Sequence, residues 1–127
     1  MKLFLDSAII KDIDKRLDSG VISGVTTNPT LIKKSGRVPD DVYADLIQDI
    51  GVQDVSIEVD GKYADTLIEN GIKYGKLWVD QATIKLPCTP EGIKACKMLN
   101  FMGIRTNMTL VFSVSQAILC ALAGATY

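Results

Sequence analysis

Short apolar runs alternate with amphipathic stretches along the whole chain. Apolar, β-branched runs predict buried strands, and apolar residues at every third or fourth position predict helices. Strands are predicted at residues 3–5, 22–26, 55–59, 82–86 and 104–109, and a turn into a sixth strand at residues 124–127. Helices are predicted at residues 7–19, near 31–32, and at residues 39–50, 62–74, 89–102 and 113–123. Ser7 is expected to cap the first of these helices and Thr89 the fifth, and either Ser113 or Ser115 is expected to start the last. Between the second strand and the next helical segment, Pro29 predicts a polar turn that stays out of helix.

Regular alternation of strands and helices predicts a parallel sheet built from right-handed βαβ units. A complete (β/α)8 barrel typically needs about 250 residues, and about 200 at the short end. The chain has 127 residues and shows no linker or low-complexity tract, so residues 1–127 are expected to form a single partial domain. The prediction is an incomplete TIM (β/α)8 barrel, with about five βα units and the start of a sixth strand. An open sheet with an exposed last edge is the alternative.

Composition narrows the classes of function. Hydrophobic residues make up 47% of the chain and charged residues 23%, with a net charge of −1, which is ordinary for a soluble globular protein and suggests neither nucleic-acid nor membrane binding. There is no histidine, so the commonest general base and metal ligand is missing. Three widely spaced cysteines fit neither a disulfide framework nor a zinc pattern. We assign them to packing and expect a reducing, cytoplasmic location.

Lys85 is the one charged residue in the apolar run at residues 82–86, which Pro87 closes. A lysine near the end of a parallel strand lies where such folds open their ligand crevice. Apolar surroundings disfavour the charged form of an amine, and the neutral amine is a nucleophile toward carbonyl groups. Alternatively, the lysine stem covers apolar surface while the ammonium reaches water.

Polar side chains recur at the carboxyl ends of the other predicted strands, which face one site in a parallel fold. In order they are Asp6, Thr26 to Asn28, Glu58, Lys85, and Asn107 to Thr109. Carboxylates, an amine, amides and hydroxyls are the groups needed to form and break a Schiff base. Each also has a structural explanation: Asp6 or Thr109 as a helix cap, Asn28 as a turn residue, and Glu58 as a solvated charge. A flavodoxin-like nucleotide binder also fits the alternation, but the first strand is not followed by a glycine-rich phosphate loop.

Four segments resemble the small transaldolases, which include the closely related fructose-6-phosphate aldolases. The segments are Leu3-Phe4-Leu5-Asp6-Ser7-Ala8, Gly24-Val25-Thr26-Thr27-Asn28-Pro29-Thr30, Ile84-Lys85-Leu86-Pro87 and Thr106-Asn107-Met108-Thr109-Leu110-Val111-Phe112-Ser113. The resemblance covers the whole chain. It implies a class I barrel enzyme, without metal or other cofactor, that transfers a dihydroxyacetone unit between sugar phosphates in the pentose phosphate pathway.

Carried over by position, the resemblance assigns a role to each residue at the strand ends. Lys85 matches the Schiff-base lysine, and Asp6 matches the acid that helps to break and form the carbon–carbon bond. Glu58 and Thr109 match the partners of the catalytic water. Glutamate at the position of Glu58 is typical of the transaldolase branch, and glutamine of the aldolase branch. Asn28 and Asn107 match residues that bind the dihydroxyacetone portion, and Thr26 matches a site hydroxyl beside Asn28.

The chain ends where the resembling proteins continue through a sixth strand, two further strands and a last helix. Their phosphate-binding arginine therefore has no counterpart in this sequence, which is expected to be a fragment of a longer frame or a truncated relative. An unclosed sheet leaves unpaired edges and uncovered apolar faces, so we expect a homo-oligomer in which a second copy completes the assembly. Fructose-6-phosphate aldolase activity and a non-catalytic, oligomerising βα scaffold are the alternatives to transaldolase activity.

Overall fold

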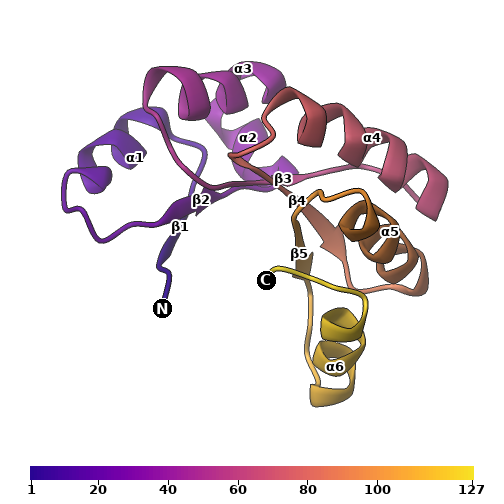
Figure 1. The fold of residues 1–127 in the computed structure, drawn as a ribbon. Coiled ribbons are helices and arrows are strands. Elements are labelled where there is room, and N and C mark those ends of the chain that lie inside the picture. Colours follow the sequence, from indigo (N-terminus) through magenta and orange to yellow (C-terminus); the bar gives the residue numbers. More distant parts are fainter. The chain divides into compact units, whose positions relative to one another are not determined.

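The computed structural model describes residues 1–127 and alternates strands with helices (Figure 1). The strands are β1 (Phe4–Asp6), β2 (Gly24–Thr26), β3 (Val55–Glu58), β4 (Ala82–Pro87) and β5 (Thr106–Thr109). The helices are α1 (Ile10–Leu17), α2 (Pro29–Ser35), α3 (Pro39–Ala44), the π-helix η1 (Asp45–Asp49), α4 (Ala64–Leu77), α5 (Pro90–Phe101) and α6 (Val114–Leu122). The strands are parallel and follow the order β1-β2-β3-β4-β5 in the sheet. The predicted incomplete α/β barrel is confirmed.

The chain divides into two compact units, Met1–Ile57 and Glu58–Tyr127. Whether they act as a single domain stays a prediction. In the first unit, β1 pairs with β2, and β2 pairs with β3. Most of its buried apolar side chains come from the strands and from helices α1, α2, α3 and η1, and these are Ile13, Val25, Ile32, Val42, Tyr43, Leu46, Val55 and Ile57. The core therefore lies on the side of these strands that the helices cover.

Two local predictions for the first unit were wrong. Ser7 does not cap α1, because the helix starts after Ile9, which makes no side-chain capping bond. The Ser7 hydroxyl instead accepts a hydrogen bond from the Ile9 N–H, at 3.2 Å. Pro29 does not hold its segment out of helix, because it is the first residue of α2. Proline suits that position, since the first turn of a helix has no use for its missing N–H.

The second unit is built on the register between β4 and β5, which pairs Ile84 with Thr106 and Leu86 with Met108. Helix α5 packs against both strands and against α4. The core between them is Val59, Leu67, Ile84, Leu86, Ala95, Cys96, Leu99, Met108, Cys120 and Ala123. As predicted, the Thr89 hydroxyl caps α5 by accepting from the Gly92 N–H at 3.1 Å, and Ser113 caps α6 by accepting from the Gln116 N–H at 3.2 Å. Such a cap stabilises a helix by about 1 kcal/mol.

The last residues do not form the predicted sixth strand, but their backbone already follows β5. The N–H of Thr126 donates to the carbonyl of Thr106 at 2.9 Å, and the N–H of Met108 donates to the carbonyl of Tyr127 at 3.0 Å. Residues 126–127 therefore lie along the edge of β5. None of the helices combines the length and the hydrophobicity needed to cross a membrane.

Gly92 lets the first turn of α5 lie directly against the end of β4. A Cβ atom at this position would come within 1.9 Å of the Pro87 carbonyl oxygen, which is backbone and cannot move aside alone. At Gly71 in α4, the nearest atom to an added Cβ would be Leu99 Cδ1, at 2.7 Å. That atom is the flexible end of a side chain. The position of the β4 carboxyl end therefore depends on the missing side chain of Gly92.

We expect Gly92→Ala to destabilise the protein by about 3 kcal/mol, the upper end of typical overpacking costs, or more. Gly71→Ala should cost much less, because Leu99 can shift and alanine favours helix by about 1 kcal/mol. The free energy of unfolding in urea measures both effects. Equal losses for the two variants would contradict the account of Gly92.

Candidate active site

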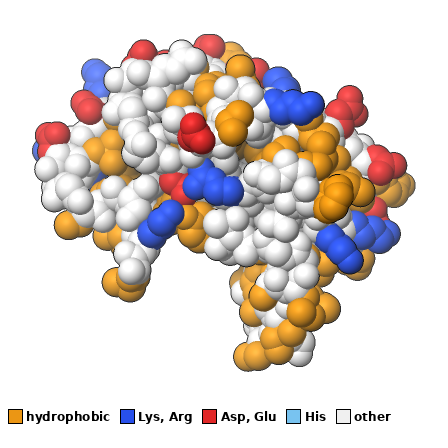
Figure 2. All heavy atoms as spheres, in the orientation of Figure 1, with side chains coloured by type: hydrophobic (Ala, Val, Ile, Leu, Met, Phe, Trp, Pro, Cys, Tyr) orange, Lys and Arg blue, Asp and Glu red, His pale blue; other side chains and the backbone are white.

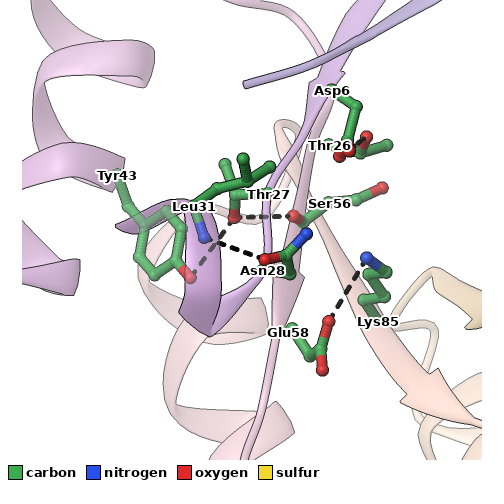
Figure 3. A network of polar contacts seen from close by, with 9 residues as sticks. All are labelled: Asp6, Thr26, Thr27, Asn28, Leu31, Tyr43, Ser56, Glu58 and Lys85. Atoms are coloured by element: carbon green, nitrogen blue, oxygen red, sulfur yellow. Dashed lines mark hydrogen bonds and ion pairs between the residues drawn. The ribbon is translucent and has the colours of Figure 1, made fainter. Parts of the chain in front are cut away.

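Lys85 and Glu58 form an ion pair at the carboxyl ends of β4 and β3. Lys85 Nζ lies 3.2 Å from Glu58 Oε2 (Figure 3). The Lys85 side chain is 12% exposed and that of Glu58 is 28% exposed. The lysine therefore does not extend its ammonium into open water, and the glutamate is not a free solvated charge. The structure gives Lys85 a carboxylate neighbour within the range at which a general base can take a proton.

The two-residue period of β4 explains why Lys85 faces away from the helices. Successive side chains on a strand point to opposite faces. Ile84 and Leu86 are fully buried in the core beneath α4 and α5. Thr83, Lys85 and Pro87 therefore share the other face. The alternation that buries Ile84 and Leu86 therefore also places Lys85 on the opposite face, at the end of the strand.

Asn107 and Thr109 share that face because of the parallel register with β5. Lys85 is paired with Asn107, and Pro87 is paired with Thr109. Both β5 side chains are partly buried. Thr109 does not cap α6, since Ser113 does so, and the structural alternative for Thr109 was wrong. The second unit thus brings together four of the predicted site residues: Glu58, Lys85, Asn107 and Thr109.

In the first unit, Asp6 and Thr26 lie side by side at the ends of β1 and β2. They are register partners, and the Thr26 hydroxyl donates to Asp6 Oδ1 at 2.8 Å (Figure 3). Asp6 does not cap α1, so its structural alternative was also wrong. The carboxylate is exposed and keeps lone pairs for a further donor. It is available for acid–base chemistry at the strand end.

Asn28 has a structural task in addition to its predicted one. It is the N-cap of α2, and its Oδ1 accepts from the Leu31 N–H at 2.9 Å. This bond fixes the side-chain amide and leaves Nδ2 as the group that can donate to a ligand. The prediction of Asn28 as a turn residue was therefore wrong. The predicted contact between Asn28 and a substrate stays a prediction, and Nδ2 is the atom that would make it.

A buried polar cluster that the sequence did not predict lies behind the Asn28 segment. The Thr27 hydroxyl lies 3.5 Å from the Tyr43 hydroxyl and 3.4 Å from the Ser56 carbonyl oxygen (Figure 3). Thr27 and Ser56 are fully buried and Tyr43 is 2% exposed. This cluster fixes the segment that carries Thr26 and Asn28. The signal in the sequence was Tyr43 itself, an aromatic residue whose hydroxyl needs a hydrogen-bond partner when it is buried.

The fold and these contacts define an α/β barrel protein with an amine–carboxylate pair at the carboxyl ends of its strands. Residues 3–127 match the model of one family, described as Transaldolase/Fructose-6-phosphate aldolase. The chain belongs to this family.

Relatives with known names agree with the family. The chain is 45% identical over 127 residues to a probable transaldolase of Symbiobacterium thermophilum, and 47% identical over 130 residues to one of Geotalea daltonii. A probable transaldolase of Lactiplantibacillus plantarum is 45% identical over 130 residues. Each match covers 100% of this chain but only 58% of the relative. The chain therefore spans well under two thirds of the length of these relatives.

We expect Glu58→Gln to destabilise the protein by about 1–3 kcal/mol, because the largely covered ammonium of Lys85 loses its charged partner. Adding Lys85→Met to the Glu58→Gln variant should recover most of the lost stability, since the double variant has no lysine charge left without a counter-ion. Urea unfolding of both single variants and the double variant gives the coupling energy. Removing the exposed partner of a surface pair, with Lys94→Gln, should have a much smaller effect. Additive effects at Glu58 and Lys85 would contradict a coupled pair.

Proposed function

We propose that the chain carries a transaldolase site, which transfers a dihydroxyacetone unit between sugar phosphates through a Schiff base on Lys85. The observation that carries the proposal is the contact of 3.2 Å between Lys85 Nζ and Glu58 Oε2 on a strand-end face shared with Asn107 and Thr109. Family membership supports the aldolase-type reaction. Substrates such as sedoheptulose 7-phosphate and fructose 6-phosphate belong to the non-oxidative pentose phosphate pathway, in the cytoplasm. No cofactor or metal takes part in the proposed reaction.

The first step of the proposed reaction attaches the ketose to Lys85. Glu58 accepts a proton from the ammonium, and the freed amine attacks the substrate carbonyl carbon. The resulting carbinolamine loses its hydroxyl as water and becomes a protonated imine. Glu58 and Thr109 together hold the water that carries protons in this step. The distance from the carboxylate to Nζ suits the direct proton transfer with which the step starts.

The second step breaks the carbon–carbon bond next to the dihydroxyacetone unit. Asp6 takes the proton of the substrate hydroxyl, the bond breaks, and its electron pair moves into the protonated imine. The aldose leaves, and the reverse sequence joins the unit to an acceptor aldose phosphate. Asn28 Nδ2, Asn107 and Thr26 bind the substrate hydroxyls. For Thr26 the supporting observation is its bond to Asp6, which orients the carboxylate.

The alternatives each have one supporting observation. A non-catalytic, oligomerising scaffold is favoured by the exposed apolar side chains of α6. Fructose-6-phosphate aldolase activity is favoured by the family description, which names both activities. Glu58 supports the transferase, because the resemblance implies glutamate at this position in the transaldolase branch and glutamine in the aldolase branch.

A transfer assay with fructose 6-phosphate and erythrose 4-phosphate tests the proposal. The chain should form sedoheptulose 7-phosphate, Lys85→Met should form none, and Asp6→Asn should be slower by about 10²–10⁴-fold, the usual contribution of a positioned acid or base. Lys94→Met, at an exposed lysine of the same unit, is the matched control and should keep full activity. A folded chain without transfer would support the scaffold. Release of glyceraldehyde 3-phosphate without an acceptor would support the aldolase.

Helix α6 supports the further proposal that the chain is a homo-oligomer. Val114, Ile118 and Leu122 form one stripe at intervals of four residues, and they are 77%, 53% and 78% exposed. Phe112, just before the helix, is 83% exposed. Apolar side chains gather over α6 at the bottom of the view in Figure 2. A continuous exposed apolar face of this kind is typical of a protein–protein interface, and we propose that a second copy covers it.

Light scattering coupled to size-exclusion chromatography tests this association. At micromolar concentration the chain should elute as a dimer or larger assembly. Val114→Glu combined with Leu122→Glu should shift it to monomer, because charges cannot be buried in an apolar interface. Val79→Glu, at another exposed valine, should leave the assembly unchanged. A well-folded monomer of the unmodified chain would rule out the oligomer.

A further inference from the structure

Two of the three cysteines lie in contact near the candidate lysine. Cys88 Sγ and Cys120 Sγ are 3.6 Å apart. Cys88 directly follows the last residue of β4, and Cys120 lies in α6 (Figure 1). The two residues are 32 positions apart in the chain, so only the fold brings them together. The sequence had suggested packing alone for both residues.

The two thiols differ in their surroundings. Cys88 is partly buried, while Cys120 is 5% exposed. Burial, together with the neighbouring Cys88, raises the pKa of the Cys120 thiol to about 11. The thiolate is the reactive form, so Cys120 is protected from direct oxidation. An oxidant from solvent therefore meets Cys88 first, with the Cys120 sulfur already in contact behind it.

We propose that Cys88 and Cys120 are a redox-sensitive thiol pair that a peroxide converts into an intramolecular disulfide. The Cys88 thiolate attacks one oxygen of hydrogen peroxide, becomes a sulfenic acid, and releases hydroxide. The Cys120 sulfur then attacks the Cys88 sulfur, loses its proton and displaces the second hydroxide. In sum, two thiols and one peroxide give one disulfide and two waters. A dithiol reductant reverses the modification.

Cys96 is not a member of the pair, although it lies in the same core. Its side chain is fully buried, and its sulfur lies 3.2 Å from the Thr106 hydroxyl and 3.8 Å from the Ala123 carbonyl oxygen. Burial raises the pKa of this thiol as well. No oxidant from solvent reaches it. Cys96 therefore provides a control cysteine within the same unit.

The disulfide would act on the end of β4. A sulfur–sulfur bond is about 2.05 Å long, so the two sulfurs must approach by roughly 1.5 Å. The Cys88 N–H donates to the Thr109 carbonyl at 2.9 Å, and Lys85 lies three residues before Cys88. Movement of Cys88 therefore reaches both candidate catalytic positions. The resulting loss of transfer activity rests on the proposed function, whereas formation of the disulfide does not.

Mild treatment with hydrogen peroxide, followed by alkylation and peptide mass mapping without reduction, tests the pair. The unmodified chain and Cys96→Ala should give one cross-linked peptide pair containing Cys88 and Cys120. Cys88→Ala and Cys120→Ala should give none. Reduction with dithiothreitol should remove the cross-link. Circular dichroism checks that each variant is folded. If one variant does not fold, the peptide map of the unmodified chain still shows whether the Cys88–Cys120 cross-link forms.

Oxidised Cys88 without a cross-link, a Cys96–Cys120 bridge, or a disulfide between two chains would overturn the proposal. In the transfer assay the oxidised protein should be slower than the reduced protein, and dithiothreitol should restore the rate. An unchanged rate would overturn the link to the site. If the reduced protein shows no transfer, the proposed function fails, and the peptide map still decides the thiol pair.

Discussion

The alternation of side chains along β4 is the constraint on which the second unit depends. Ile84 and Leu86 must face the core beneath α4 and α5, so Lys85 must face the other way. Parallel pairing with β5 then places Asn107 beside the lysine, and Glu58 supplies the charge that balances it. Gly92 completes this arrangement, because α5 can approach the end of β4 only where no Cβ atom intervenes. Stability and chemistry therefore rest on the same strand.

Most of the fold could be predicted from the sequence, because strand and helix periods and capping residues are local signals. The positions of the candidate residues at strand ends followed from the same periods, while their roles in catalysis and binding stay predictions. Thr89 and Ser113 cap their helices as predicted. Pro29 misled the prediction, since a proline that excludes helix before it can also begin one. The Tyr43 cluster and the Cys88–Cys120 contact depend on side chains brought together from distant segments. A local pattern can suggest that Tyr43 is buried with its hydroxyl bonded, but it cannot identify the partner of Tyr43 or of Cys88.

The family and the geometry support the same chemistry at different levels. The family match establishes the kind of protein, and the ion pair gives the strand-end lysine Lys85 a carboxylate at 3.2 Å. Within the first unit, the Thr26 hydroxyl donates to the carboxylate of Asp6. The chain covers 58% of the length of these relatives, and it exposes an apolar stripe on α6. Formation of a covalent adduct on Lys85 and transfer to an acceptor sugar can therefore be measured separately.

Trapping the covalent intermediate tests the central claim most directly. The folded chain is incubated with fructose 6-phosphate, reduced with sodium borohydride, and digested for peptide mass analysis. We expect a reduced adduct on Lys85, absent from other lysines and absent without the sugar phosphate. A folded chain that shows no adduct, or an adduct on another lysine, would contradict the assignment of Lys85 as the nucleophile.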